Sequence, residues 1–156
     1  MRIEAYIRVL GDEATVRAIH AETNLPNAKI KRLKARKGTF SEEMWWNWET
    51  ERTSVEPDNA DGGLKALLLV HRAIFPTIKK NQVETDIYLE VVTQYQEGEE
   101  PQGLYLSAET VQLLSEMGGA LDNDVVTQMR EERGNQKKTT ETWQPLICRV
   151  IGHVSG

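Results

Sequence analysis

Cysteine is nearly absent from this sequence. Cys148 is the single cysteine among 156 residues, so no disulfide can form within the chain, which fits a reducing cytoplasm. The N-terminus carries Arg2 and Glu4 where a secretory signal needs its apolar segment. No apolar run approaches the ~20 residues of a membrane-spanning helix. We therefore expect a cytoplasmic protein.

The sequence also lacks the motifs of common metal and nucleotide sites. One cysteine and three separated histidines cannot form a tetrahedral zinc set at the known spacings. The glycine pairs at 62–63 and 118–119 match neither the Walker nor the dinucleotide-binding spacing. Asp122 and Asp124 could offer oxygen ligands to a hard cation, but a calcium loop needs several more spaced ligands. We accordingly predict no catalytic residue, no metal and no cofactor.

The composition describes a soluble globular protein of mildly acidic character. Hydrophobic residues make up 39% of the chain and charged residues 28%, with a formal net charge of −5. A chain of this length buries roughly 70% of its unfolded surface on folding. The acidic excess argues against binding nucleic acid or anionic membranes through bulk electrostatics.

The stretch 86–129 predicts a strand, a loop, a helix and a second strand, in that order. Ile87, Leu89 and Val91 alternate with polar residues, which is the period of a half-buried strand. A polar loop follows. Ser107 then stands where a helix N-cap is needed, because its hydroxyl can accept an unpaired amide of the first turn.

The helix after this cap is predicted to end at Gly118-Gly119, because glycine enters the left-handed conformation without a Cβ clash. A further strand is predicted to begin at Leu121 and to include Val125 and Val126. The apolar stripe of the helix, which should face the core, is predicted to comprise Val111, Leu113, Leu114 and Met117.

The N-terminal part of the chain repeats this order. Residues 3–9 alternate as a strand, and Asp12 is the predicted N-cap of a helix that extends to about Thr23. Residues 15–19 after this cap match residues 110–114 after the second cap. Two similar strand–helix–strand halves sharing one sheet are one interpretation of the match, and coincidence between amphipathic helices is the other.

A basic run at residues 29–37 precedes a strand rich in tryptophan. The alternation over 44–52 places Trp46 and Trp48 on a core-facing side and Trp45 on the other. Cations beside aromatic rings can hold a nucleic-acid strand by phosphate contact and base stacking. The alternative is a solvated strand face paired with the acidic residues of the tryptophan strand. The candidate interaction surface comprises Lys29, Lys31, Arg32, Lys34, Arg36, Lys37 and Trp45.

The middle of the chain predicts a loop and then a helix. Residues 54–63 are predicted to form a polar connection. A helix is predicted over 64–75 with Asp61 as a candidate cap. Pro76 stops or kinks this helix, because proline cannot sit in an unbroken helix interior.

Residues 129–156 are predicted to lie outside the first domain, which spans 1–128. The segment 130–142 is polar throughout and predicts a linker. The segment 146–151 is apolar on both faces, so we expect an additional strand that is covered on both sides or pairs with a second copy of this chain.

Several signals along the chain form one series: Asp12-Glu13 at the first helix, Leu25-Pro26, the tryptophan strand 45–50, the helix 64–75 with Pro76, the opening 106–109, Met117-Gly118 and the segment 121–124. Taken in this order, the signals resemble those of a bacterial family catalogued as domain of unknown function 4279, over residues of about 1–128. The chain has Ala108 where members of that family usually carry proline. The family brings no activity and no catalytic residue, so the resemblance implies no site.

Together these patterns predict an α+β fold in two layers. We expect an antiparallel or mixed sheet of about five strands, covered on one face by three helices. For function we expect a non-enzymatic cytoplasmic binding protein that acts on a protein partner, of immunity type or regulatory. One alternative is a nucleic-acid-associated module that uses residues 29–37. Another is a small ligand-binding domain or enzyme with its pocket where helices meet the sheet.

Overall fold

The structure, a computed structural model, describes residues 1–33 and 45–128. The linker and strand predicted within 129–156 lie outside these residues. The elements follow in the order β1 (Arg2–Gly11), α1 (Glu13–Thr23), β2 (Lys29–Arg32), β3 (Trp46–Glu49), β4 (Thr53–Val55), η1 (Pro57–Asn59), α2 (Ala60–Val70), η2 (Arg72–Ile74), α3 (Phe75–Lys79), β5 (Asp86–Gln96), α4 (Ala108–Met117) and β6 (Ala120–Gln128).

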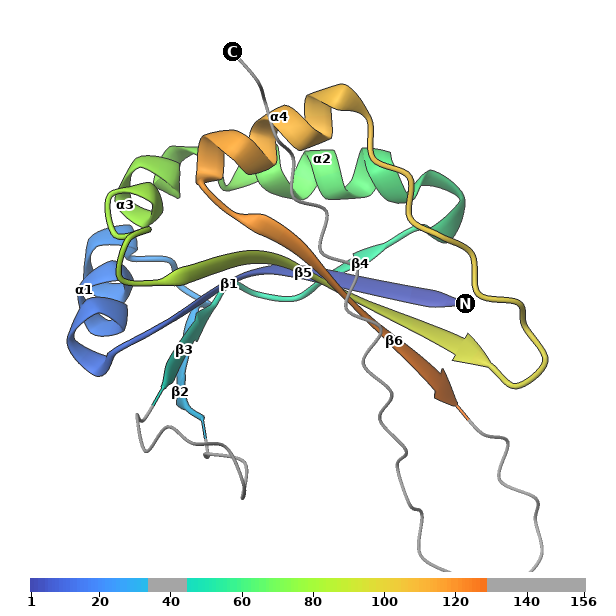
Figure 1. The fold of residues 1–156 in the computed structure, drawn as a ribbon, viewed down its shortest axis with the longest axis horizontal. Coiled ribbons are helices and arrows are strands. Elements are labelled where there is room, and N and C mark those ends of the chain that lie inside the picture. The colour runs from blue at the N-terminus through green and yellow to red at the C-terminus, as the bar shows by residue number, and fades with distance from the viewer. Residues whose placement is uncertain (34–44, 129–156) are drawn as a thin grey trace, which may run out of the picture.

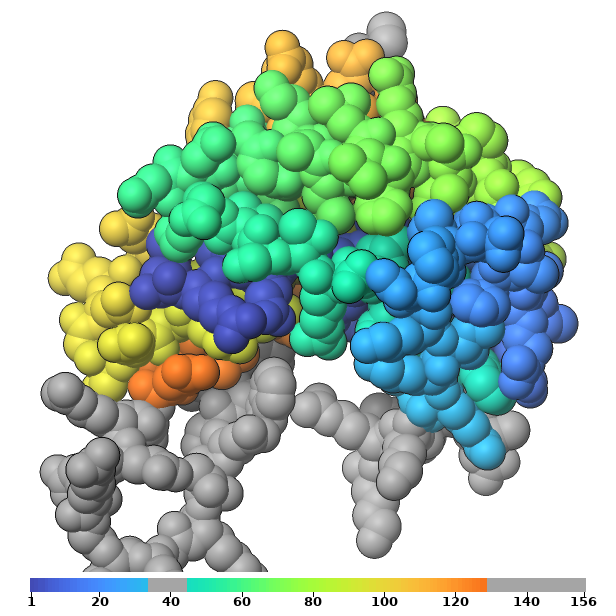
Figure 2. Space-filling view, turned by 180° about the vertical axis from the view of Figure 1, so that it is seen from behind, coloured from blue at the N-terminus to red at the C-terminus, as the bar shows by residue number. Residues whose placement is uncertain are grey.

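All strands of the described residues belong to one mixed sheet. Its order is β2-β3-β1-β5-β6, and β4 pairs with the other end of β1. The pair β5–β6 is parallel, and every other pair is antiparallel. The helices lie on one face of this sheet (Figure 1). Seen from the opposite side, α2 and α3 in green form a layer above β1 in dark blue (Figure 2).

This arrangement confirms the predicted two-layer α+β fold with a mixed sheet. The described part of the chain holds six strands and four α-helices, against the predicted five and three. The additional strand is β4, which overlaps the start of the predicted polar connection 54–63. That prediction is wrong, because Val55 is 4% exposed and belongs to the core.

The core lies between the central strands and the helices. Alternate residues of β1 and β5 face the helices, and Ile7 lies opposite Leu89. Both side chains are fully buried. From the neighbouring strand β3, Trp48 is fully buried in the same layer, as predicted, whereas Trp46 is partly buried. Burying this apolar surface is the main favourable term in folding.

The two predicted helix caps are confirmed. The backbone N–H of Thr15 donates to Asp12 Oδ1 at 3.0 Å, and that of Thr110 donates to Ser107 Oγ at 3.3 Å. Each cap satisfies an amide that the first helical turn leaves unpaired. The end of α4 is also as predicted, because Gly118 has a φ of 76°.

The predicted stripe of α4 needs one correction. Val111 is 37% exposed, whereas Leu113, Leu114 and Met117 are buried. Thr110 is fully buried in its place, because its hydroxyl donates to Asp61 Oδ1 at 2.7 Å. The buried side of the helix therefore keeps three of the four predicted residues and includes Thr110 in place of Val111.

Asp61 has a different role from the predicted one. Helix α2 begins at Ala60, and Asp61 lies inside its first turn. The Asp61 carboxylate accepts the backbone N–H of Ser107 at 2.9 Å in addition to the Thr110 hydroxyl. Burial acts to raise the pKa of Asp61, but these hydrogen bonds outweigh it and lower that pKa. Asp61 thus connects α2 to the start of α4.

The predicted long helix is interrupted. Residues 64–75 span the end of α2, the 3₁₀-helix η2 and the first residue of α3. The break comes before Pro76, as predicted. Pro76 then stands in the first turn of α3, where its missing N–H removes no helical hydrogen bond.

The two strand–helix–strand segments share some features and differ in one. The segments β1–α1 and β5–α4 have the same type of cap, and the buried positions alternate identically along both strands. However, β6 pairs directly with β5, whereas β3 lies between β1 and β2. The duplication stays a prediction.

Candidate functional site

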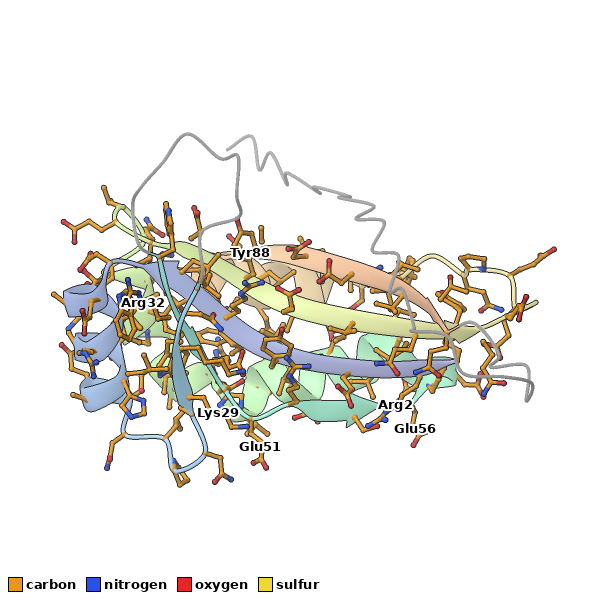
Figure 3. The ribbon with its side chains drawn as sticks, turned by 90° about the horizontal axis from the view of Figure 1, so that it is seen from below. Arg2, Lys29, Arg32, Glu51, Glu56 and Tyr88 are labelled. Atoms are coloured by element: carbon orange, nitrogen blue, oxygen red, sulfur yellow. The ribbon has the colours of Figure 1, made fainter. Side chains whose placement is uncertain are left out.

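The sheet face opposite the helices carries most of the buried charge in the described chain. We call it the open face, since no helix of residues 1–33 and 45–128 lies over it. Figure 3 looks onto it, with β1, β5 and β6 in front of the helices. Its side chains come from alternate positions of five strands, which the register aligns. The polar residues on this side include Glu4, Tyr6, Arg8, Lys31, Asn47, Glu49, Glu90, Asp122 and Asp124.

A chain of hydrogen bonds crosses four strands of the open face. Lys31 Nζ on β2 donates to Glu49 Oε1 on β3 at 2.6 Å, and Asn47 Nδ2 donates to Glu49 Oε2 at 3.0 Å. On β1, Arg8 Nε donates to Asn47 Oδ1 at 3.3 Å, and its Nη1 donates to Glu90 Oε2 on β5 at 3.1 Å. We call these five residues the polar chain. Cationic and anionic side chains alternate along it, so each carboxylate has a cation beside it.

Glu90 is the most deeply buried charged residue of this face. It is 1% exposed. Burial raises the pKa of Glu90 from 4.5 to about 7, although Arg8 acts to lower it. Asp122 and Asp124 raise it further through charge repulsion. Glu90 therefore holds its proton to a higher pH than an exposed glutamate does.

The register explains why these three carboxylates are neighbours. Glu90 lies opposite Asp122 on the parallel strand β6, and Asp124 follows two residues later on the same side. Asp122 and Asp124 are both partly exposed. We call Glu90, Asp122 and Asp124 the acidic end of the open face.

The opposite end of the polar chain has its charges matched. Burial acts to raise the pKa of Glu49, but hydrogen bonds from Lys31 and Asn47 outweigh it and lower that pKa. Glu49 is thus stabilised as an anion, whereas Glu90 is not. The contrast has two causes: Glu90 is the more deeply buried of the two, and Asp122 and Asp124 repel its charge, whereas Glu49 accepts hydrogen bonds from Lys31 and Asn47.

A third cluster lies beside the polar chain on β1. The guanidinium of Arg52 sits 4.6 Å from the ring centre of Tyr6, which is a cation–π contact. Burial, together with the nearby Glu90 carboxylate, raises the pKa of Tyr6 to about 12. Tyr6 therefore stays protonated at neutral pH.

The candidate surface predicted from the sequence is only partly described. Lys29, Lys31 and Arg32 lie on the edge strand β2, and Lys31 joins the polar chain. Trp45 is 37% exposed. The remaining cations, Lys34, Arg36 and Lys37, lie outside the described residues.

Sequence reasoning missed the residues at the centre of the open face. Arg8 and Glu90 sit at outward positions of two alternating strands, where the pattern predicts solvent. The interpretation of the basic run as a strand face paired with acidic residues of the tryptophan strand agrees with the ion pair between Lys31 and Glu49. The pattern did not indicate that Asn47 and Glu49 are each only 4% exposed. The signal that could identify the site is the pairing register, which the spacing of apolar residues within a strand does not contain.

A shallow groove lies elsewhere, between α2 and α4 on the helix side. In residues 1–33 and 45–128, no three or more His, Cys, Asp or Glu side chains are placed to hold a metal ion. Among the helices that the structure describes, none combines the length and apolarity needed to cross a membrane.

The order of elements can now be compared with known families. The model of a family described as a domain of unknown function (DUF4279) matches residues 1–128. The chain belongs to this family. The match to DUF4279 ends at the last residue of β6, so it covers the whole described sheet and helix layer. Neither curated proteins nor solved structures show a match to this DUF4279 chain.

The raised pKa of Glu90 predicts a specific pH dependence. Below pH 4.5 the group is protonated in both the folded and the unfolded chain, so its stabilising effect is complete. As the pH rises through the folded value of about 7, that stability is lost, by on the order of 3 kcal/mol. In Glu90→Gln the side chain stays neutral. We expect the variant's free energy of unfolding, relative to the parent, to grow by about 3 kcal/mol between pH 4.5 and 8.

Urea unfolding at a series of pH values measures this difference. Glu56→Gln, at an exposed residue, makes the same change in formal charge away from the open face. Its stability difference should stay nearly flat with pH. A flat difference for Glu90→Gln as well would contradict a Glu90 carboxyl whose pKa burial raises.

Proposed function

We propose that this DUF4279 domain is a non-catalytic interaction module, and that the acidic end of its open face binds a cationic segment of a partner protein. The observation that carries the proposal is the burial of Glu90 beside Asp122 and Asp124. A Lys or Arg side chain of a partner, placed against the two aspartates, would favour the ionised form of Glu90 by charge attraction. Such a module fits an immunity-type or regulatory role, which requires a specific surface.

The accessibility of the residues supports binding over catalysis. Glu90 has a pKa suited to proton transfer near neutral pH, but a 1% exposed carboxylate offers a substrate almost no contact. The two aspartates are partly exposed and can contact a partner. Glu90 is buried and would attract a cation of the partner electrostatically, without contact. The acidic excess of the whole chain would also speed the approach of a cationic partner.

The nucleic-acid alternative has less support. Lys31, a central member of the basic run, is held in a 2.6 Å ion pair with Glu49. Phosphate binding would compete with that pair and would face the acidic end across the same sheet.

Binding of a labelled peptide of alternating Arg and Ser, followed by fluorescence anisotropy at low salt, tests the proposal. Asp124→Lys reverses charge at the acidic end, and we expect it to weaken binding by about tenfold or more, which is about 1.4 kcal/mol. Binding to the parent should tighten as the pH rises from about 6 to 8, because Glu90 loses its proton in that range.

Asp58→Lys is the matched control. Asp58 is an exposed aspartate in η1, so the variant has the same net charge as Asp124→Lys but an unchanged open face. It should bind the peptide within about twofold of the parent. Equal weakening by both variants would mean that net charge alone explains the effect, and it would overturn the proposed site. Absence of peptide binding at low salt would overturn it as well.

A further inference from the structure

Helix α2 presents an apolar surface to solvent on the side away from the sheet. Among its eleven residues only Asp61 and Lys65 are charged. Its inner side buries Leu64, Leu67 and Leu68, yet Leu69 is 49% exposed. A surface helix normally carries polar residues on its outer side. This outer surface therefore has the composition of an interface.

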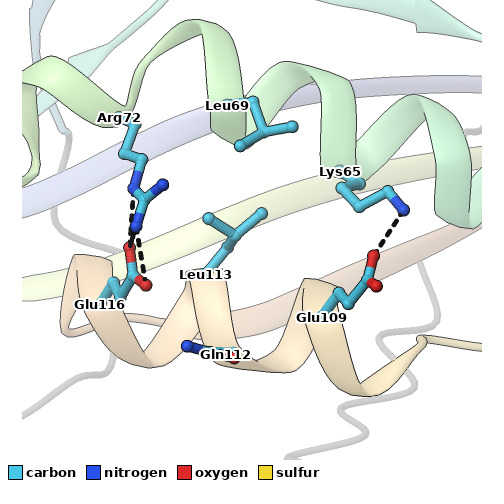
Figure 4. Close-up of a pocket in the computed structure, with 7 residues that line it drawn as sticks. All are labelled: Lys65, Leu69, Arg72, Glu109, Gln112, Leu113 and Glu116. Atoms are coloured by element: carbon cyan, nitrogen blue, oxygen red, sulfur yellow. Dashed lines mark hydrogen bonds and ion pairs between the residues drawn. The ribbon is translucent and has the colours of Figure 1, made fainter.

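A groove of about 290 Å³ runs between α2 and α4 beside this surface. Figure 4 shows Leu69 and Leu113 at its centre and an ion pair at each end. Lys65 Nζ lies 2.8 Å from Glu109 Oε2, and Arg72 Nη2 lies 2.8 Å from Glu116 Oε2. We call this region the α2–α4 groove.

The charges of the groove are sorted by element. Both cations come from the α2–η2 side, and both acids come from α4. The two helices run in the same direction, since Lys65 and Arg72 meet Glu109 and Glu116 in sequence order. The side chains of all four residues remain between 33% and 74% exposed. Each pair can therefore still receive charges from another molecule.

We infer that the α2–α4 groove is the interface of a homodimer. A two-fold axis that runs along the groove places α2 of one copy over α4 of the other. In each copy, Lys65 then lies opposite Glu109 of the other copy. Arg72 likewise lies opposite Glu116 of the other copy, at the same position along the groove. Leu69 of both copies meets at the apolar centre. An axis across the groove would instead place like charges over one another, so charge complementarity selects one arrangement.

The inference is independent of the proposed function. The groove lies on the helix side of the sheet, so a dimer formed there leaves both open faces pointing outward. The contact is small, because α2 with its eleven residues is about 16 Å long. An interface of this size is at the low end of specific interfaces, so we expect dissociation in the micromolar range.

Sedimentation velocity at protein concentrations from about 1 to 300 µM tests the inference, since this range brackets a micromolar dissociation constant. The parent chain should change from monomer to dimer within it. Leu69→Asp should remain a monomer throughout. Val83→Asp is the matched control, because Val83 is 92% exposed and lies outside the groove, and it should dimerise like the parent.

Charge exchange tests the geometry. The variant Lys65→Glu/Arg72→Glu and the variant Glu109→Lys/Glu116→Lys should each be monomeric alone and should form a dimer when mixed. A chain with all four substitutions restores every pairing and should dimerise by itself. Each change affects exposed ion pairs, so all variants should fold.

A parent that stays monomeric at every concentration would overturn the inference. A dimer that tolerates Leu69→Asp would also overturn it. If the two charge variants fail to dimerise with each other, the proposed axis is wrong, and the inference falls with it.

Discussion

Replacing Arg8 by methionine is expected to lower the free energy of unfolding by about 3–5 kcal/mol near pH 8. Methionine keeps the length and apolar part of the side chain but removes the charge. Glu90 then stays buried beside Asp122 and Asp124 without the guanidinium that now donates to it at 3.1 Å. Removing one partner of a buried ion pair costs far more than the pair contributes, because the other charge is left desolvated.

The matched control is Arg2→Met. It is the same substitution on the same strand and the same side of the sheet, but the Arg2 side chain is 64% exposed. Its surface pair with Glu4 should contribute within about 0.5 kcal/mol. Denaturant unfolding of the two variants compares them directly, and equal effects would contradict the central role of Arg8.

The cost of Arg8→Met should also depend on pH. Near pH 5 Glu90 is largely protonated in the folded chain, so less uncompensated charge remains. The substitution should accordingly cost less at that pH. In a Glu90→Gln background it should cost less at pH 8 as well, and the double-mutant cycle measures the coupling of the pair. Absence of coupling would mean that Arg8 acts through packing alone.

Leu114→Ala is expected to cost about 2–5 kcal/mol of stability. Leu114 is 7% exposed and packs in the core between α4 and the sheet. The loss combines the buried apolar surface with the cavity that alanine leaves. Thermal or urea unfolding measures it, and against a typical total stability of about 5–15 kcal/mol the change is large.

Val111→Ala is the comparison on the same helix. Hydrophobic spacing places Val111 in the core stripe, but the structure leaves it 37% exposed. Its replacement should cost well under 1 kcal/mol, because little surface is buried and alanine favours the helix. A loss equal to that of Leu114→Ala would mean that Val111 packs in the core, as hydrophobicity alone predicts.

The sequence predicted well those features that depend on neighbouring residues. The caps at Asp12 and Ser107 and the end of α4 at Gly118 rest on contacts within one helical turn. The alternation of β1 and β5 likewise depends on a local period. These signals give element type and much of the core.

Features that depend on distant residues were missed or misplaced. Thr110 replaces Val111 in the core because Asp61, 49 residues away in sequence, accepts its hydroxyl. Strand β4 was hidden in a polar segment because it is short and only Val55 is buried. Both outcomes depend on which elements meet, which local patterns do not encode.

The amino-acid order by itself determined a small two-layer α+β domain of the DUF4279 family with capped helices and two alternating central strands. Only the tertiary structure decided the candidate site, because pairing β1 with β5 and β5 with β6 brings Arg8, Glu90, Asp122 and Asp124 together. Each of these residues occupies an ordinary outward strand position when taken alone. Their burial and their mutual charges exist only once the strands are in register.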